Sequence, residues 1–154
     1  MLIRAATPAD IPAIRNLDLA SPFGARWSDL HYHELFARAD RFKHLVLLAE
    51  DIAHASGEKH PAAYLVASGV GAEWELENVV VATTMLRRGI ARALIEELLE
   101  GLRRDGVTHI HLEVRESNSA ARALYAALGF VEENRRPEYY ANPAEAAIIL
   151  AKTL

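Results

Sequence analysis

Residues suited to anion chemistry stand at a strand-to-helix turn. The apolar run at residues 79–81 is followed by small polar residues, and Arg87, Arg88 and Gly89 then precede a helical segment. A helix N-terminus exposes unpaired N–H groups and the positive end of the helix dipole, which together favour an anion. Glycine lets a ligand approach the backbone closely. The pattern indicates a phosphate site, and the alternative is an ordinary connection with exposed arginines.

A carboxylate and a phenol follow further along the chain. Apolar and polar side chains alternate over residues 108–115, which places Glu113 on the polar face of a strand. Tyr125 stands at helical spacing in the next segment. Both residues also have a purely structural interpretation, as a solvated strand residue and a packing aromatic. The residues alone therefore support a phosphate-bearing cofactor site with a carboxylate and a phenol nearby.

Periodicity and turn signals predict the elements that position these groups. Strands are expected at residues 2–6, 43–50, 61–70, 73–81 and 108–115, and helices at 11–20, 29–39, 88–104 and 117–128. Thr7 with Pro8 and Asp10 predicts the first helix start, Ser28 caps the second helix, and Gly129 ends the last. Residues 144–154 suit a closing strand, although their alanines also suit a helix. This order predicts an α/β sandwich around one mixed sheet.

Composition narrows the class of protein. The chain has 154 residues, a net charge of -4 and no cysteine. We therefore expect one domain over residues 1–154, without disulfides, thiolate metal sites or cysteine nucleophiles. The charge gives no reason to expect nucleic acid or an anionic membrane as partner. The first residues show no secretory signal and the apolar runs are too short to span a bilayer, so the expected location is cytoplasmic.

The turn sequence "LRRGIAR", residues 86–92, closely resembles the acetyl-CoA-binding motif of the GCN5-related N-acetyltransferase (GNAT) superfamily, Gln/Arg-x-x-Gly-x-Gly/Ala. The resemblance implies a mixed, mostly antiparallel sheet of six to seven strands flanked by about four helices. Its splayed central strands would form the acetyl-CoA cleft. Two departures stand out: Leu86 occupies the Gln/Arg position, and Ala91 replaces the last glycine, which the motif permits. Binding through backbone N–H groups should weaken, and not disappear, without a donor at Leu86.

The resemblance assigns cofactor contacts by position. The pyrophosphate would be held by Arg87, Arg88, Gly89, Ile90, Ala91 and Arg92, and the pantetheine and acetyl groups by the backbone of Val79, Val80 and Val81. Asn118 would contact CoA, and it is also placed to help cap the following helix.

Residues 112–130 look like the second half of the same superfamily core, and residues 135–150 resemble the C-terminal signature of a narrower branch, the ribosomal-protein alanine N-acetyltransferases. In that branch the glutamate of "LEVR" is the general base and the tyrosine of "ALYAALGF" the general acid, which match Glu113 and Tyr125. Acetyl transfer needs a base for the amine proton and an acid for the CoA thiolate. Glu77, on the preceding strand, is the rival base, because other members of the superfamily carry their glutamate there.

The acceptor side is assigned from the same branch. Arg136, Tyr139 and Tyr140 resemble its acceptor loop, and Phe23 and Trp27 would cover the peptide groove from the other side. The resemblance implies direct transfer from acetyl-CoA to a primary amine, with a protein N-terminal α-amine as the first choice.

Alternatives stay open at this point. Residues 141–147 carry "EAA" where the branch has an acidic stretch, which leaves room for a small amine or a lysine side chain as acceptor. A CoA-binding module without turnover is the second alternative.

The His-x-His pairs at residues 31/33 and 109/111 have no cysteine or obvious third ligand, so no metal is expected. The basic patch is not interleaved with aromatics, which argues against nucleic acid. A monomer and a homodimer are both compatible with an exposed last strand.

Overall fold

The computed structural model describes residues 1–38, 41–53, 55–141 and 144–154. Its strands are β1 (Leu2–Ala5), β2 (Lys43–Ile52), β3 (Lys59–Val70), β4 (Glu73–Val81), β5 (His109–Arg115), β6 (Val131–Tyr140) and β7 (Glu145–Thr153). Its α-helices are α1 (Ile11–Ala20), α2 (Asp29–Glu34), α3 (Ile90–Arg104) and α4 (Ser119–Ala127), with 3₁₀ turns η1 (Pro8–Asp10) and η2 (Thr83–Met85).

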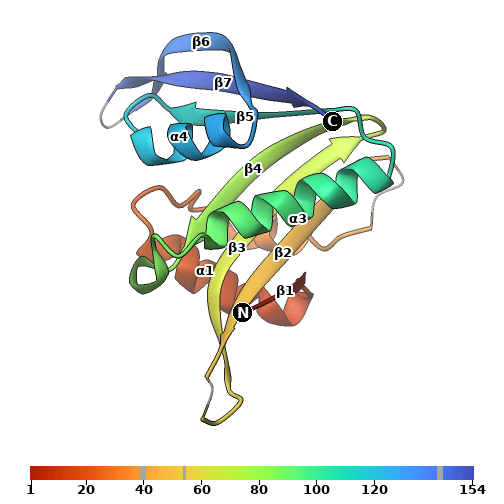
Figure 1. Ribbon diagram of the computed structural model, residues 1–154, viewed down its shortest axis with the longest axis vertical. Helices are drawn as coiled ribbons and strands as arrows, with labels where there is room; N and C mark the ends of the chain where they lie inside the picture. Colours follow the sequence, from red (N-terminus) through yellow and green to blue (C-terminus); the bar gives the residue numbers. More distant parts are fainter. Residues whose placement is uncertain (39–40, 54, 142–143) are drawn as a thin grey trace.

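The described strands form one seven-stranded sheet in the order β1-β2-β3-β4-β5-β7-β6 (Figure 1). Every neighbouring pair in it is antiparallel except β4 with β5, which run parallel. The predicted mixed, mostly antiparallel sheet with helices packed on it is confirmed.

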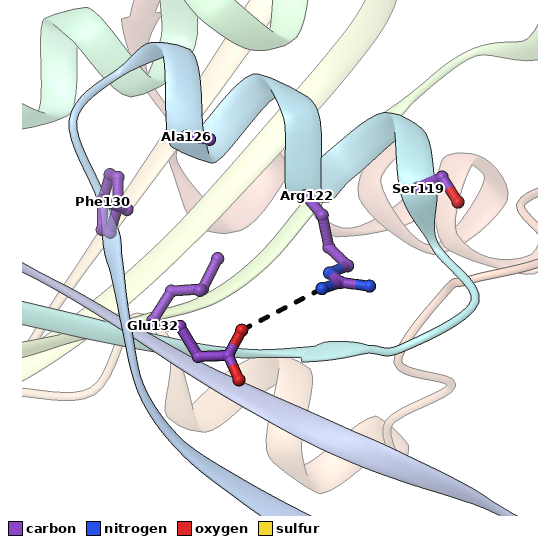
Figure 2. Close-up of a pocket in the computed structure, with 6 residues that line it drawn as sticks. Ser119, Arg122, Ala126, Phe130 and Glu132 are labelled. Atoms are coloured by element: carbon purple, nitrogen blue, oxygen red, sulfur yellow. Dashed lines mark ion pairs between the residues drawn. The ribbon is translucent and has the colours of Figure 1, made fainter.

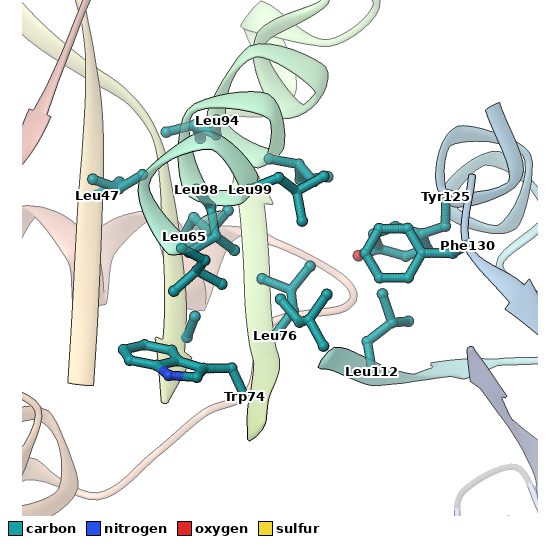
Figure 3. Close-up of a cluster of buried hydrophobic side chains, with 14 of the residues drawn as sticks. Leu47, Leu65, Trp74, Leu76, Leu94, Leu98, Leu99, Leu112, Tyr125 and Phe130 are labelled. Atoms are coloured by element: carbon teal, nitrogen blue, oxygen red, sulfur yellow. The ribbon is translucent and has the colours of Figure 1, made fainter. Parts of the chain in front are cut away.

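Helices cover both faces of the sheet (Figure 1). On one face α3 lies over β2–β4 and α4 lies beside β5–β7, and their apolar residues share one core with the sheet (Figure 3). The predicted α3 stripe is confirmed, because Ile90, Leu94, Leu98 and Leu102 are all buried. Ile11 and Ile14 of α1 and Tyr32 of α2 build the second core, on the opposite face.

The central strands separate soon after they meet. Strand β4 pairs with β5 only at Glu73, Trp74 and Glu75, opposite residues 109–111 of β5. The register of β4 against β3 then shifts between Leu76 and Asn78, so Glu77 is the extra residue of a β-bulge. A bulge bends its strand and increases the local twist, which directs the second half of β4 away from β5 (Figure 1). The expected splay of the central strands is confirmed.

Several expected boundaries change. Helix α3 begins at Ile90 and not at residue 88, because Gly89 adopts a left-handed backbone that ends the turn. Helix α2 stops at Glu34, and residues 39 and 142–143, in the expected helix and the acceptor loop, lie outside the described residues. Residues 145–153 form a strand and not a helix. Within the described residues, no helix combines the length and the hydropathy of a membrane span.

Candidate active site

The turn before α3 has the geometry of an anion site. Gly89, the N-cap residue, has a φ of 77°, and Arg87 has a φ of 64°. A Cβ built on Gly89 would meet no described atom within 4 Å, so the surface beside it is open. No side chain caps the helix, and the N–H groups of its first turn therefore lack the partners that later turns have. These groups and the helix dipole suit a phosphate lying against the turn.

The arginines around this turn differ in their environment. Arg87 and Arg88 are exposed, and neither forms an ion pair with the described part of the chain. Arg92 is held along the helix by Glu96, with 3.1 Å between Nη1 and Oε1. Ile90 is buried in the core, so only its backbone can reach a ligand. The positive charge that remains available to an anion comes from Arg87 and Arg88.

Strand β4 leads into the turn with one edge unpaired. Val79, Val80 and Val81 pair with β3, but β5 has already separated from β4 at Glu75. Backbone N–H and C=O groups that point toward β5 are therefore without a strand partner among the described residues. An extended ligand can pair with such an edge as another strand would. The unpaired edge of β4 leads directly to the turn at residues 86–89, which we call the phosphate turn. This order fits a long cofactor that contains a pyrophosphate.

Asn118 is the N-cap residue of α4. Its Oδ1 accepts a hydrogen bond of 3.2 Å from the Ala121 N–H. The capping role expected from the sequence is confirmed, and the contact of Asn118 with CoA stays a prediction.

Tyr125 projects from α4 into the core on the α3 side of the sheet. It is 9% exposed and packs edge-on against Phe130, with ring centroids 5.6 Å apart. Figure 3 shows its hydroxyl oxygen pointing from α4 toward strand β4. Burial raises the pKa of the Tyr125 phenol to about 12. The phenol therefore keeps its proton at neutral pH. It can serve as a proton donor in the region between β4 and β5.

Glu113 lies on the opposite face of β5 from the buried residues Leu112 and Val114. Its Oε1 is 3.0 Å from Nη1 of Arg136, and its side chain is 22% exposed. The negative charge of Glu113 raises the pKa of Tyr139, which is therefore close to the same carboxylate. The structure thus brings together three residues that the sequence assigned separately to catalysis and to the acceptor side.

Tyr140 has a different role from Tyr139 in the folded chain. Its ring lies 4.2 Å from the guanidinium carbon of Arg115, a cation–π contact at the end of β5. Burial is the main reason why the pKa of the Tyr140 phenol is raised. The Tyr140 ring therefore packs against the end of β5, and its contact with an acceptor stays a prediction.

Glu77, the rival base, occupies the β4 bulge. Its Oε1 lies 3.9 Å from Nε2 of His44, and its side chain is 18% exposed. Glu75 is a neighbouring carboxylate that the sequence analysis did not single out. Burial raises its pKa, and the charges of Glu77 and Glu113 raise it further. The alternation in "EWELE", residues 73–77, places Glu75 and Glu77 on the same side of β4. This alternation is the sequence signal that could have identified Glu75.

The residues expected to cover the peptide groove lie between α1 and α2. Phe23 is 51% exposed. Trp27 packs on α2, with ring centroids 4.6 Å from His31 and 5.8 Å from Tyr32, and its role in covering the groove stays a prediction. The structure therefore leaves Phe23 on the surface, while Trp27 anchors the loop.

A pocket of about 300 Å³ lies beside α4, on the side facing β6 and β7 (Figure 2). Arg122 and Glu132 approach to 4.0 Å across it, and Phe130 forms one wall. Arg122 also donates to the Glu116 carbonyl. None of the predicted site residues lines this pocket, so it is separate from the turn and the splay.

The histidine pairs do not form a metal site. In the part of the chain that the structure describes, no three His, Cys, Asp or Glu side chains gather in an arrangement that could hold an ion. His111 instead lies near a carboxylate, with its Nε2 3.8 Å from Oε2 of Glu75.

Known proteins resemble this chain in sequence. The family model described as "Acetyltransferase (GNAT) family" matches residues 11–130. The [ribosomal protein bS18]-alanine N-acetyltransferase of Salmonella typhimurium is 40% identical over 116 residues, which cover 74% of this chain and 73% of the relative. Its namesake from Escherichia coli strain K12 is 44% identical over 92 residues, or 58% of this chain and 62% of the relative.

Solved structures resemble it in fold. The crystal structure of the ribosomal-protein-S18-alanine N-acetyltransferase from Escherichia coli has a TM-score of 0.80 and 32% identity, covering 99% of this chain and 92% of that one. Arabidopsis thaliana NAA60 in complex with acetyl-CoA has a TM-score of 0.86 at 18% identity, covering 99% and 98%, which shows a common fold. The chain therefore belongs to the acetyltransferase (GNAT) family and is an N-acetyltransferase that uses acetyl-CoA.

Proposed function

We propose that this enzyme acetylates the α-amine at the N-terminus of a protein, as the ribosomal-protein alanine N-acetyltransferases that it resembles are named for doing. The alternatives, a small amine or a lysine side chain, lack a feature of the structure that favours them. The proposal is supported by the residues that flank the splay between β4 and β5.

Acetyl-CoA supplies an acetyl group already activated as a thioester. The pyrophosphate would be bound by the N–H groups at Gly89, Ile90 and Ala91, with charge from Arg87 and Arg88. The unpaired edge of β4 would hold the pantetheine arm, which directs the thioester toward the point where the strands separate. Two observations fit this cofactor: the start of α3 has no side-chain cap, and the second half of β4 has an unpaired edge.

Glu113 would act as the general base. It accepts a proton from the acceptor amine, directly or through one water, as the nitrogen bonds to the acetyl carbon. Tyr125 would act as the general acid, giving its proton to the sulfur as the carbon–sulfur bond breaks. Burial weakens Tyr125 as an acid, but a thiolate in the same apolar surroundings is also destabilised, so the transfer remains feasible. The products are an amide and free CoA. Glu113 has gained the proton that the amine lost, and Tyr125 has given up the proton that the sulfur gained.

One observation carries the proposal: the carboxylate and the phenol approach the splay from opposite faces of the sheet. Glu113 points away from the core that Leu112 and Val114 enter, whereas Tyr125 is part of that core. An acceptor arriving on the Glu113 face therefore meets a cofactor arriving on the Tyr125 face. This arrangement would allow direct transfer between two bound substrates, without a covalent acetyl-enzyme.

The test uses purified enzyme, acetyl-CoA and short peptides that differ only in their first residue. CoA release and peptide mass are followed together. We expect acetylation of an alanine-started peptide at its α-amine, and no reaction when that amine is blocked in advance. Acetylation of small amines alone would replace the proposed acceptor, and CoA binding without any product would indicate a module without turnover.

A further inference from the structure

Asp18, near the end of α1, is a fully buried carboxylate with 0% exposure. Its Oδ1 accepts hydrogen bonds from the Ala25 N–H at 2.7 Å and the Tyr64 hydroxyl at 2.6 Å. Its Oδ2 accepts from the Arg26 N–H at 2.7 Å and the Tyr32 hydroxyl at 2.8 Å. No cation pairs with it among the described residues, so hydrogen bonds offset the cost of burying its charge.

The loop at residues 21–28 is folded around this carboxylate. Two successive N–H groups of the loop point at Asp18, and Arg26 adopts a φ of 54° to allow this. Gly24 packs so closely that a Cβ there would lie 2.1 Å from the Asp18 carbonyl oxygen. The same loop presents Phe23 to the surface and Trp27 to α2. Its shape therefore depends on Asp18.

The other side of the network reaches the central strands. Asn78 donates through Nδ2 to the Tyr64 hydroxyl at 2.8 Å and to Asp18 Oδ1 at 3.3 Å. Asn78 directly follows Glu77, the bulged residue of β4. Burial, and then the hydrogen bond to Asp18, raise the pKa of both Tyr32 and Tyr64, so the phenols retain the protons that they donate. One carboxylate thus connects the loop to the strand that borders the splay.

We infer that Asp18 is a positioning residue for the acceptor, holding the loop at residues 21–28 at a fixed distance from the β4 bulge. This inference rests on the proposed function and on the expectation that Phe23 and Trp27 of this loop cover the peptide groove, which together would place the acceptor beside the loop on the Glu113 face of the sheet. Asp18 touches neither substrate and acts through Ala25, Arg26 and Asn78. Its loss should therefore change how the acceptor binds while the phosphate turn before α3 stays intact.

The first variant is Asp18→Asn, which keeps the shape of the side chain but replaces one acceptor oxygen with a donor. Loss of hydrogen bonds to a charged group should raise the KM for the peptide about tenfold or more. The Kd for acetyl-CoA should stay within about twofold, because the turn at Gly89 belongs to another part of the fold. Tyr32→Phe, which removes one donor to Asp18, should raise the peptide KM by a smaller factor and serves if Asp18→Asn does not fold.

Glu50→Gln is the matched control. Glu50 is also a buried carboxylate, at 6% exposure, but it pairs with Arg4 on β1 and forms no hydrogen bond or ion pair with the loop in the part of the chain that the structure describes. The Glu50→Gln substitution should lower the Tm of the enzyme without raising the KM for the peptide. A fall in Tm for Asp18→Asn and Tyr32→Phe with the peptide KM unchanged would reduce Asp18 to a structural residue and overturn the inference.

Hydrogen exchange of the loop amides separates this inference from the proposed function. In the wild-type enzyme the Ala25 and Arg26 amides should be protected, and in Asp18→Asn they should exchange at least tenfold faster while the α3 amides do not change. If the wild type acetylates no peptide, the proposed acceptor is wrong, yet the exchange result still decides whether Asp18 holds the loop. Equal exchange in both proteins would contradict the inference.

Discussion

Glu113 and Arg136 meet across strand β7, with 3.0 Å between the carboxylate Oε1 and the guanidinium Nη1. The arginine side chain is 54% exposed and the glutamate side chain 22%. The contact therefore fixes the carboxylate at the splay through a partner that can move into solvent. If Glu113 is the base, as we propose, an incoming amine would have to share its carboxylate with Arg136, which would couple acceptor binding to strand β6.

The proximity of Glu113 to Tyr139 has a measurable consequence. The carboxylate charge is the main cause of the raised pKa of Tyr139, because it disfavours a second negative charge beside it. Glu113→Gln should therefore lower the pKa of Tyr139 toward the usual tyrosine value. An NMR titration of the tyrosine rings measures this. Tyr125, whose raised pKa is due to burial alone, is the internal control and should not move. An unshifted Tyr139 would show that the two groups are apart in solution.

Tyr125→Phe separates catalysis from packing. The phenylalanine ring keeps the edge-on contact with Phe130, so the free energy of unfolding should change by less than about 1 kcal/mol. Loss of the proton donor should lower kcat by about 10²-fold. Because the phenol titrates only near pH 12, the wild-type pH profile should show no alkaline limb from this group below about pH 10. Wild-type kcat in the variant would remove Tyr125 from the mechanism.

The phosphate turn is tested by Gly89→Glu. A side chain there has space in the free protein but carries its charge to the place where the pyrophosphate would lie. We expect the Kd for CoA to rise at least about 100-fold, the effect of a few kcal/mol. Gly71→Glu is the matched control, because Gly71 also has a positive φ of 57° and open space around it. Equal CoA affinity in the two variants would contradict a pyrophosphate site at Gly89.

Part of this arrangement was predictable because its signals are local. The apolar end of β4, the glycine after it and the stripe of α3 predicted a strand, a turn and a helix in their observed places. Strand β6 had no such signal: it lies at the sheet edge and nearly all of its residues are exposed, so they show no alternation. The bulge at Glu77 was also hidden, since the sequence alternates through it and only the pairing with β3 reveals the extra residue.

The contacts of the site are mostly nonlocal, and this limits what the sequence shows. Glu113 and Arg136 come together only because β6 and β5 both pair with β7. Asp18 is one aspartate in an amphipathic helix, which usually indicates an exposed residue. Its side-chain donors come from α2, β3 and β4, and the sheet has to form before they converge.

The acid stability of the chain should depend on Asp10. Hydrogen bonds from Arg4 lower the pKa of Asp10 from 3.8 to about 2. Because the folded pKa lies below the unfolded one, the stabilisation is present above about pH 4 and is lost as the pH falls toward 2. Asp10→Asn should lower the free energy of unfolding at pH 7 by up to about 2 kcal/mol, with the difference from wild type shrinking below pH 4.

Urea unfolding at several pH values measures this dependence. Asp29→Asn is the control, because Asp29 pairs with Arg15 at the surface with its side chain 71% exposed, and such pairs contribute about 0–1 kcal/mol. A pH-independent difference between Asp10→Asn and wild type would show that the Arg4 contact is absent in solution.

The central claim is that Glu113 is the base for acetyl transfer to an N-terminal amine. It is tested most directly by initial rates with an alanine-started peptide in the wild type, Glu113→Gln and Glu77→Gln. We predict a loss in kcat of at least about 10²-fold for Glu113→Gln with unchanged acetyl-CoA affinity, and less than about tenfold for Glu77→Gln. The reverse order would place the base in the β4 bulge, and equal activity in all three would contradict carboxylate catalysis at this splay.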